Sequence, residues 1–317
     1  MSKELILPVL RSGKYGFIDN HYNLAIKPKY NYVSSRFKEG YCIVTYIKKI
    51  RNNTKWIFGY IDNKGNTNFF LQLEGVNQFY EGLSKIRINS KYGFFNKYLQ
   101  EEIKPTYNAA LNFNEGLCGV KINKKWGFIN KKGVVIIDPI YTYVNSFCNE
   151  RALVEIENKY AYIDKNGNIS INGDYDIGCD FSESLASVKK NNKWGYIDIN
   201  GNIVIDYLYD KAKCFKDGLA PVCINNKWGY IDKYGKLVID TVFDYACVFN
   251  EGLARVNIKK EQINQSNWGF INTKGEMIIK PKFKYVSDFF EGYAQINENK
   301  NNYIDKNGNL IISSITI

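Results

Sequence analysis

Carboxylates that could act in catalysis recur at fixed places in this chain of 317 residues. One series ends the segments of the type YID, and its members are Asp19, Asp62, Asp164, Asp198, Asp232 and Asp305. A second series belongs to segments of the type FxEG, with members Glu39, Glu81, Glu115, Glu183, Asp217, Glu251 and Glu291. Any one of them could act as a general base. A catalytic group is needed once, however, so we interpret the first series as turn caps and the second as loop contacts to backbone or to a neighbouring lysine.

Thiols and imidazoles give less support for catalysis or metal binding. The cysteines stand singly and form no CxxC pair; they are Cys42, Cys118, Cys148, Cys179, Cys214, Cys223 and Cys247. This pattern favours reduced, packed thiols in the cytoplasm over disulfides or a zinc site. The single histidine, His21, is interpreted as a loop residue. A thiolate nucleophile needs an activating partner. We therefore expect no enzymatic activity, no metal and no cofactor.

Lysines are the more suggestive candidates, because the chain carries a net charge of +11 and has a pI of about 9.1. One lysine precedes the first aromatic residue of a repeated WG-type segment, most regularly at Lys91, Lys125, Lys159, Lys193 and Lys227. A row of such cations would attract an acidic partner or a phosphate backbone. The alternative is structural, with each lysine packed on a ring or paired with an FxEG acid. The basic residues are also mixed with Asp and Glu, unlike a dedicated nucleic-acid surface.

The lysines belong to a repeat that defines the organisation of the chain. Its first aromatic residue is Tyr15, Phe58, Tyr92, Trp126, Tyr160, Trp194, Trp228 or Trp268, and Asn301 takes this place in a ninth, degenerate copy. The commonest spacing is 34 residues. The single repeat array 1–317 is predicted to consist of units near 1–40, 41–82, 83–116, 117–150, 151–184, 185–218, 219–252, 253–292 and 293–317.

Each repeat predicts a small antiparallel sheet. Asp198 and Gly201 follow a strand and are typical of a tight turn, and the apolar segment after them predicts the second strand of a hairpin. Several units then have a proline, which disfavours strand pairing, before the FxEG segment and a third strand. We expect a three-stranded meander with a tucked loop in every unit. No segment has a helical period.

Both faces of the WG strand are apolar, so neighbouring units must cover them. Trp194 is expected to be buried between sheets, and Gly195 to allow the neighbouring unit to approach closely. The predicted fold is all-β: a tandem array of nine antiparallel units of about 34 residues that forms an open, curved β-solenoid. The alternative is a closed or spiral β-propeller, which usually has four to eight blades of four strands.

Segments such as KWGYIDKYG, followed downstream by FNEGLARV, resemble the WG-repeat family, also called KWG repeats, of bacterial proteins. The resemblance runs from about Glu4 to the C-terminus. Ala161 departs from the pattern where glycine is expected, the third unit lacks the turn glycine, and the ninth lacks both Trp and Gly. The resemblance implies a protein that mediates interactions.

We therefore expect a non-enzymatic repeat scaffold that binds another protein, in particular an acidic one. The alternative is binding of nucleic acid or another polyanion through the lysine row. Two insertions, at residues 46–54 and 259–266, are expected to protrude from the same edge of the array and to contribute to binding. The chain has no apolar run of eighteen residues and no signal-peptide pattern, so we expect a cytoplasmic protein without a membrane partner.

Overall fold

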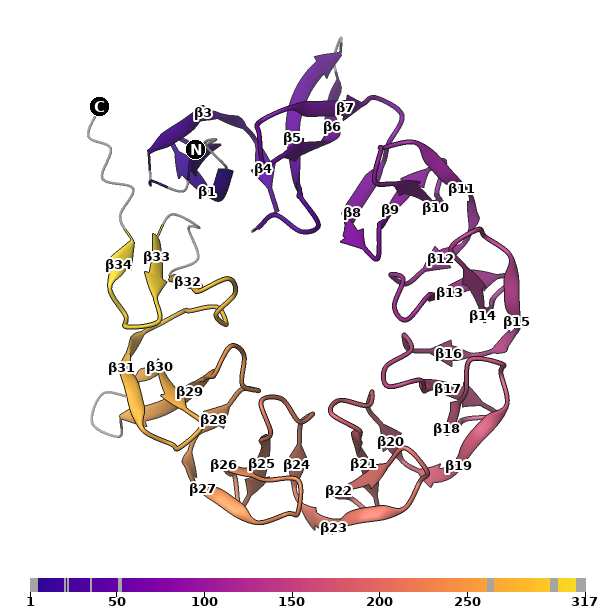
Figure 1. The fold of residues 1–317 in the computed structure, drawn as a ribbon, viewed down its shortest axis with the longest axis vertical. Helices are drawn as coiled ribbons and strands as arrows, with labels where there is room; N and C mark the ends of the chain where they lie inside the picture. Colours follow the sequence, from indigo (N-terminus) through magenta and orange to yellow (C-terminus); the bar gives the residue numbers. More distant parts are fainter. Residues whose placement is uncertain are drawn as a thin grey trace. The chain divides into compact units, whose positions relative to one another are not determined.

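The computed structural model describes residues 5–19, 21, 23–34, 36–50, 53–260, 265–296 and 302–311. Throughout these ranges the regular secondary structure is β-strand, in nine antiparallel sheets that we call blades 1 to 9 (Figure 1). The chain divides into two compact units on either side of residues 140 and 141. The first unit holds blades 1–4 and the second holds blades 5–9.

The first unit begins with a three-stranded blade and continues with three four-stranded blades. Blade 1 consists of β1 (Leu5–Arg11), β2 (Lys14–Asp19) and β3 (Leu24–Tyr30). Blade 2 consists of β4 (Tyr32–Val33), β5 (Tyr41–Ile50), β6 (Asn53–Asp62) and β7 (Thr67–Phe70). Blade 3 consists of β8 (Gly75–Tyr80), β9 (Leu83–Ile88), β10 (Lys91–Asn96) and β11 (Glu101–Tyr107). Blade 4 consists of β12 (Ala109–Ala110), β13 (Leu117–Ile122), β14 (Lys125–Asn130) and β15 (Val135–Tyr141).

The second unit repeats the four-stranded pattern and ends with a three-stranded blade. Blade 5 consists of β16 (Tyr143–Val144), β17 (Ala152–Ile156), β18 (Lys159–Ile163) and β19 (Ile169–Tyr175). Blade 6 consists of β20 (Ile177–Gly178), β21 (Leu185–Lys190), β22 (Lys193–Asp198) and β23 (Ile203–Tyr209). Blade 7 consists of β24 (Lys211–Ala212), β25 (Ala220–Ile224), β26 (Lys227–Ile231) and β27 (Leu237–Phe243). Blade 8 consists of β28 (Tyr245–Ala246), β29 (Leu253–Lys260), β30 (Gln265–Asn272) and β31 (Met277–Phe283), and blade 9 of β32 (Tyr293–Ile296), β33 (Asn302–Asp305) and β34 (Leu310–Ile311).

The sequence predicted three strands in each unit, whereas each full blade has four. A segment of two residues before the FxEG loop pairs with the next strand, as Ile177 does with Lys189 and Gly178 with Val188 in blade 6. Blade 6 therefore spans residues 177–209, whereas the repeat unit predicted from the WG spacing spans 185–218. The sheets are thus offset from the predicted units by one short strand.

The blades are of the β-propeller type, which was the alternative prediction, and the open solenoid is wrong. The four strands of each full blade lie in chain order, and from blade 3 to blade 8 one residue joins the last strand to the first strand of the next blade, as Asp210 joins β23 to β24. Serial four-stranded sheets joined in this way are characteristic of propeller blades. In Figure 1 the blades of the second unit follow an arc, with β19, β23 and β27 on its convex side.

The apolar core lies between consecutive blades, as the two apolar faces of the strands predict. One cluster, for example, joins Tyr196 and Ile205 of blade 6 to Phe215 and Val222 of blade 7. In seven pairs of consecutive blades, an aromatic ring of the third strand (second strand in blade 1) contacts the FxEG phenylalanine, with ring centroids 4.7–5.6 Å apart: Phe17–Phe37, Tyr60–Phe79, Phe94–Phe113, Tyr162–Phe181, Tyr196–Phe215, Tyr230–Phe249 and Phe270–Phe289. These pairs supply the contact between one blade and the next.

The aromatic residue of WG itself is less buried than predicted. Trp228 is 5% exposed, but the other members of the series, including Trp194, are half-buried. Tyr196, two residues after Trp194, is fully buried instead. The reason is position along the strand, because Trp194 pairs with Tyr209 near the end of the blade, whereas Tyr196 pairs with Ile205 at its centre.

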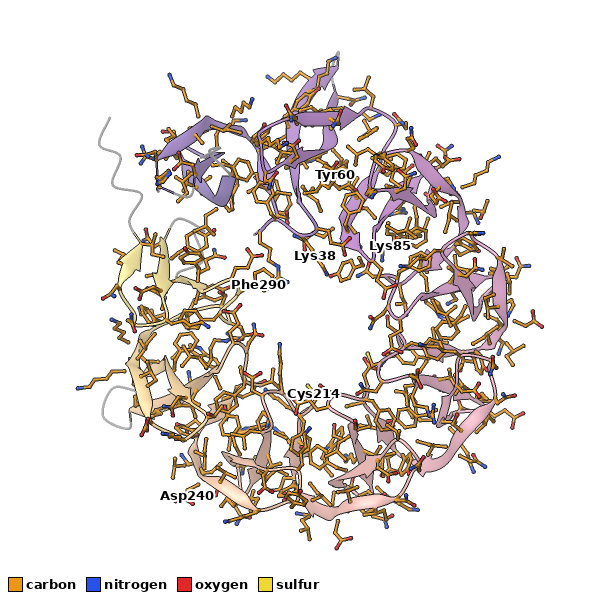
Figure 2. All side chains as sticks on the ribbon, in the orientation of Figure 1. Lys38, Tyr60, Lys85, Cys214, Asp240 and Phe290 are labelled. Carbon is orange, nitrogen blue, oxygen red and sulfur yellow. The ribbon has the colours of Figure 1, made fainter. Side chains whose placement is uncertain are left out.

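Tyrosine at the buried position adds a hydrogen bond across the blade junction. The hydroxyls of Tyr162, Tyr196 and Tyr230 donate to the carbonyl oxygens of residues 179, 213 and 247 over 2.7–2.8 Å. Tyr60 does the same to Asn77 over 3.1 Å (Figure 2). Where phenylalanine stands instead, as at position 94, the thiol of Cys118 donates to the equivalent carbonyl of Leu111. In both cases the buried carbonyl oxygen accepts a hydrogen bond from a side chain.

The glycine of WG has a different role from the one predicted. A Cβ atom on Gly195 would lie 2.6 Å from the carbonyl oxygen of Ile205, which belongs to β23 of the same blade. The register between β22 and β23 is irregular at this point, so the backbone of the last strand lies against the glycine. The close approach is therefore within a blade and not between neighbouring units.

The two insertions lengthen the same hairpin in their respective blades. In blade 2, β5 and β6 each have ten residues, and in blade 8, β29 and β30 each have eight, whereas β21 and β22 of blade 6 have six. The tips, at residues 51–52 and 261–264, lie outside the described residues. Both insertions thus extend the hairpin between the second and third strands, and their contribution to binding stays a prediction.

We expect Gly195→Ala to lower the free energy of unfolding by about 1–3 kcal/mol, as overpacking does. The added methyl group would meet the backbone of β23, which has little room to move. Ala161→Gly is the matched variant, because blade 5 already has alanine at this position and pairs it with Asn172. We expect that change to cost no more than about 1 kcal/mol. Urea denaturation measures both, and equal losses would contradict the role assigned to Gly195.

Candidate functional site

The lysine row predicted as a binding site opens the third strand of blades 3 to 7. Lys91, Lys125, Lys159, Lys193 and Lys227 are the first residues of β10, β14, β18, β22 and β26. In blades 6 and 7 the lysines are engaged, because Lys193 lies 2.6 Å from Asp210 and Lys227 lies 2.8 Å from Asp244. Each acid stands 17 residues after its lysine and not in an FxEG segment. Lys193 also lowers the pKa of Asp210, together with the amide of Asn225.

The aspartates of the YID series cap turns, as predicted. The Oδ1 atom of Asp198 accepts hydrogen bonds from the amides of Asn200 and Asn202, over 2.9 and 2.8 Å. Equivalent pairs of bonds form at Asp19, Asp62, Asp164, Asp232 and Asp305. His21 is a residue of the first such turn, as its interpretation as a loop residue requires. Their Oδ1 atoms are therefore occupied by backbone amides.

FxEG acids link consecutive blades at five junctions of the described chain. The carboxylate of Glu39 in blade 2 accepts bonds from the amides of Glu81 and Gly82 in blade 3, both over 2.8 Å. The same contact recurs from Glu81 to Gly116, over 2.9 Å. Further along the chain it recurs from Glu183 to Gly218, from Asp217 to Gly252 and from Glu251 to Gly292. This predicted contact to backbone therefore forms a series of inter-blade hydrogen bonds.

A lysine completes this link in several blades, as the sequence predicted. Lys131 lies 3.2 Å from Glu81, Lys233 lies 3.1 Å from Glu183, and Lys306 lies 3.2 Å from Glu251. Each follows the turn cap of the next blade directly. Where the acid is the shorter Asp217, or is replaced by Asn149, the lysine position holds Thr273 or Ile199. The lysine is therefore absent where the glutamate is absent.

The environment lowers the pKa of these carboxyl groups. Burial alone would raise the pKa of Glu81, but the amide of Gly116 and the ammonium group of Lys131 outweigh it. The same balance, with Gly292 and Lys306, holds the pKa of Glu251 below its ordinary value. The ionised form of each acid is therefore the one that the folded structure stabilises.

The thiols lie mostly in packed surroundings. All seven cysteines are free, and burial raises the pKa of both Cys42 and Cys118 to about 12. Burial likewise raises the pKa of Cys214, which is half-buried. In the described part of the chain, no group of three or more His, Cys, Asp and Glu side chains could hold a metal ion. Over the same residues, no helix has the length and apolar character to span a membrane.

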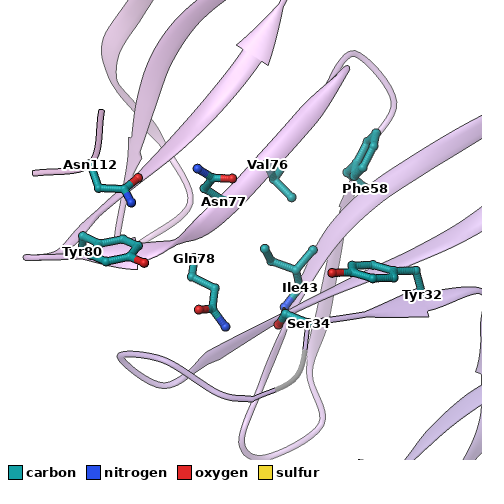
Figure 3. Close-up of a pocket in the computed structure, with 9 residues that line it drawn as sticks. All are labelled: Tyr32, Ser34, Ile43, Phe58, Val76, Asn77, Gln78, Tyr80 and Asn112. Atoms are coloured by element: carbon teal, nitrogen blue, oxygen red, sulfur yellow. The ribbon is translucent and has the colours of Figure 1, made fainter. Parts of the chain in front are cut away.

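A hollow of about 350 Å³ lies between blades 2 and 3 (Figure 3). Amide groups of Asn77, Gln78 and Asn112 and rings of Tyr32 and Tyr80 line it, with no carboxylate or histidine among its lining residues. Gln78 also bridges the blades, because its Nε2 atom donates to the carbonyl of Arg36 over 2.9 Å. The hollow can offer neutral hydrogen-bonding groups and aromatic faces. Sequence reasoning missed it because Gln78 and Tyr80 have no counterpart at the same positions of the other units.

Positive charge is concentrated in one part of the chain. Residues 1–140 contain 22 Lys and Arg and 10 Asp and Glu, a net charge of +12. Residues 141–317 contain 21 and 22, a net charge of −1. Three of the five predicted row lysines, Lys159, Lys193 and Lys227, therefore belong to the part without excess positive charge. A polyanion would be attracted to the first part.

Fold and site together define a tandem β-repeat protein of the propeller type, in which repeated residues join the blades. The model of the WG containing repeat matches residues 15–46, 58–92, 92–126, 126–160, 160–194, 194–228, 228–260 and 268–301. The chain belongs to the WG-repeat family, which confirms the resemblance noted in the sequence. No curated protein sequence matches the chain.

One solved structure supports the fold at low sequence identity, and others are less similar. A crystal structure of a eukaryotic initiation factor has a TM-score of 0.64 and 10% identity, over 98% of this chain and 96% of that one. Hsv2 of Kluyveromyces marxianus has a TM-score of 0.43 and 9% identity, over 74% and 94%. BBS1N, solved in complex with ARL6DN, has a TM-score of 0.35 and 14% identity, over 73% and 86%. The first of these shows a shared fold.

The inter-blade carboxylates give stability a pH dependence. In the folded protein the pKa values of Glu81 and Glu251 lie below the ordinary 4.5. Their contribution to the free energy of unfolding is therefore complete above about pH 4.5, and it is lost as the pH falls through the folded-state pKa values. We expect the double variant E81Q/E251Q to be less stable than the wild type at pH 7, with a difference that shrinks towards about pH 3. Urea denaturation across this range measures it. E101Q, at an exposed glutamate of β11, is the control, and a constant difference for E81Q/E251Q would contradict the assignment.

Proposed function

We propose that the protein is a non-enzymatic scaffold that binds an extended segment of another protein along the last strands of blades 6 and 7. The observation that carries the proposal is the exposure of large aliphatic side chains on β23 and β27. Ile203 and Leu208 are 54% and 61% exposed, and Leu237 and Val242 are 41% and 59% exposed. Asp240, on β27, lies at the outer side of its blade (Figure 2). Grouped apolar side chains on a surface favour contact with another protein.

The backbone of these strands supports the same proposal. Both β23 and β27 stand at the end of the strand order of their sheets, with hydrogen-bonded strands on one side only. An exposed edge offers donors and acceptors to which an extended segment can add as a further strand. Alternate side chains of such a segment would then contact the exposed aliphatic residues.

Proline distinguishes the last strands of different blades. Among the last strands of seven residues, β3, β11, β15 and β31 contain Pro28, Pro105, Pro139 and Pro281. In β19, β23 and β27 the corresponding residues are Gly173, Tyr207 and Thr241. Proline at an edge disfavours the addition of a further strand. The proline-free edges are consecutive and belong to one unit, which favours a common partner there.

The occupancy of the repeated acids supports a non-enzymatic role. Asp198 and Asp232 bind turn amides, and Glu183 and Asp217 bind the amides of the next blade. A general base must be able to reach a substrate proton. These acids instead hold the scaffold together, and the aliphatic strands present its binding surface.

We expect L208D/V242D to abolish binding to the partner while the melting temperature changes little, because both side chains are exposed. I140D is the matched control, since Ile140 holds the same strand position in β15, is 60% exposed and follows Pro139. The protein immobilised through its terminus is incubated with native lysate, and the retained proteins are quantified by mass spectrometry. Hydrogen exchange with the retained partner should then slow in β23 and β27. Equal retention by L208D/V242D and I140D, or exchange unchanged in both strands, would contradict the proposal.

A further inference from the structure

A second surface, in the first unit, has a chemistry that the proposed protein-binding strands lack. A cleft of about 430 Å³ lies between blades 1 and 2. Its lining includes the rings of Tyr30, Tyr46 and Phe69 and the ammonium groups of Lys14 and Lys29, and no carboxylate is among the lining residues. The rings of Tyr46 and Phe69 stand edge to face with centroids 4.7 Å apart. Aromatic rings and two lysines therefore line the same cleft.

The long hairpin of blade 2 extends the positive charge beyond the cleft. Lys48 and Tyr46 share one face of β5, because they are two residues apart. Lys55 of β6 is the direct cross-strand partner of Lys48, and both lysines are exposed. Like charges directly opposite each other destabilise a hairpin. In the described ranges neither lysine makes an ion pair, so an external anion is the group that would relieve their repulsion.

The sequence around the cleft contains few acids that could pair with its lysines. Residues 23–61 contain eight Lys and Arg and a single carboxylate, that of Glu39. Glu39 is engaged by the amides of Glu81 and Gly82. Coulomb attraction by the lysines is therefore not cancelled locally, and the first unit as a whole has the positive charge that would guide an anion to the surface.

We propose that this cleft binds single-stranded nucleic acid. A base stacks on the rings of Tyr46 and Phe69, and the phosphates on either side contact Lys14 and Lys29 in the cleft and Lys48 and Lys55 on the hairpin. Stacking on aromatic rings beside a basic groove is the chemistry by which proteins hold unpaired strands. A duplex keeps its bases stacked, and the rings lie in a recess that a flat bilayer cannot enter. An unpaired strand fits both the recess and the charge.

The test uses the full chain and a fluorescein-labelled dT15 oligonucleotide, with fluorescence anisotropy read at several salt concentrations. We expect K48Q/K55Q to raise Kd at least tenfold. Its slope of log K against log salt should fall in magnitude by about 1.4, because each phosphate contact to a single strand contributes about 0.7. Removal of the opposed charges should leave the melting temperature unchanged or raise it. The matched control is K159Q/K236Q, which removes two exposed lysines from the other unit and should bind as the wild type does.

A second variant separates base stacking from charge. Phe69→Leu keeps an apolar side chain but removes a ring that is 36% exposed. We expect Kd for dT15 to rise about 5- to 100-fold with the salt slope unchanged, as loss of one stacked base does. Heparin, poly-glutamate and phosphatidylglycerol vesicles carry charge without bases and should bind more weakly than dT15.

Three outcomes would overturn the proposal. One is the absence of dT15 binding at about 50 mM salt, where phosphate contacts are strong. Another is equal binding of heparin, poly-glutamate or vesicles together with no effect of Phe69→Leu, which would indicate a general anion or membrane surface. The last is an equal loss in K48Q/K55Q and K159Q/K236Q. None of these results bears on L208D/V242D, so this inference and the protein-binding proposal can fail independently.

Discussion

Contact between the buried aromatic rings of consecutive blades is the interaction on which the rest of the structure depends. Tyr196 of blade 6 and Phe215 of blade 7 have centroids 4.9 Å apart, and both side chains are fully buried. A single blade is apolar on both faces, so it cannot bury these rings without a neighbour. The small residue Ala220, which belongs to the same cluster, leaves space for them. Each copy of the repeat therefore supplies half of two interfaces.

Polar groups at the blade junctions follow from this packing. Once the rings hold two blades together, the carbonyl of Lys213 is covered and needs a donor, which the Tyr196 hydroxyl provides. The FxEG loops then lie close enough for the Glu183 carboxylate to reach the amide of Gly218. Lys233 adds its charge to the same carboxylate. These bonds give the packing a direction, because the acid of one blade binds amides of the following blade at Glu39, Glu81, Glu183, Asp217 and Glu251.

The sequence predicted what recurs and missed what depends on distant partners. Turn caps such as Asp198 and the apolar faces of the strands are written in each repeat, and both were predicted. The strand Ile177–Gly178 was missed, because two residues have no periodicity and only pairing with Lys189 and Val188 defines them. The role of Gly195 was assigned to the wrong neighbour, since a sequence cannot show that an irregular register brings Ile205 against it.

The same reasoning bears on the repeated lysines, whose role in binding stays a prediction. A residue repeated in every blade answers a need that every blade has, and Lys193 and Lys227 accordingly pair with acids of the scaffold. A ligand, by contrast, occupies particular blades, so residues that bind it must differ between copies. Two such differences stand out. Tyr207 occupies a position at which several other blades have proline. Lys48 and Lys55 lie opposite each other in a hairpin that is lengthened in only a few blades. In a repeat protein, the search for function therefore belongs to the departures from the repeat, after the packing has explained what is constant.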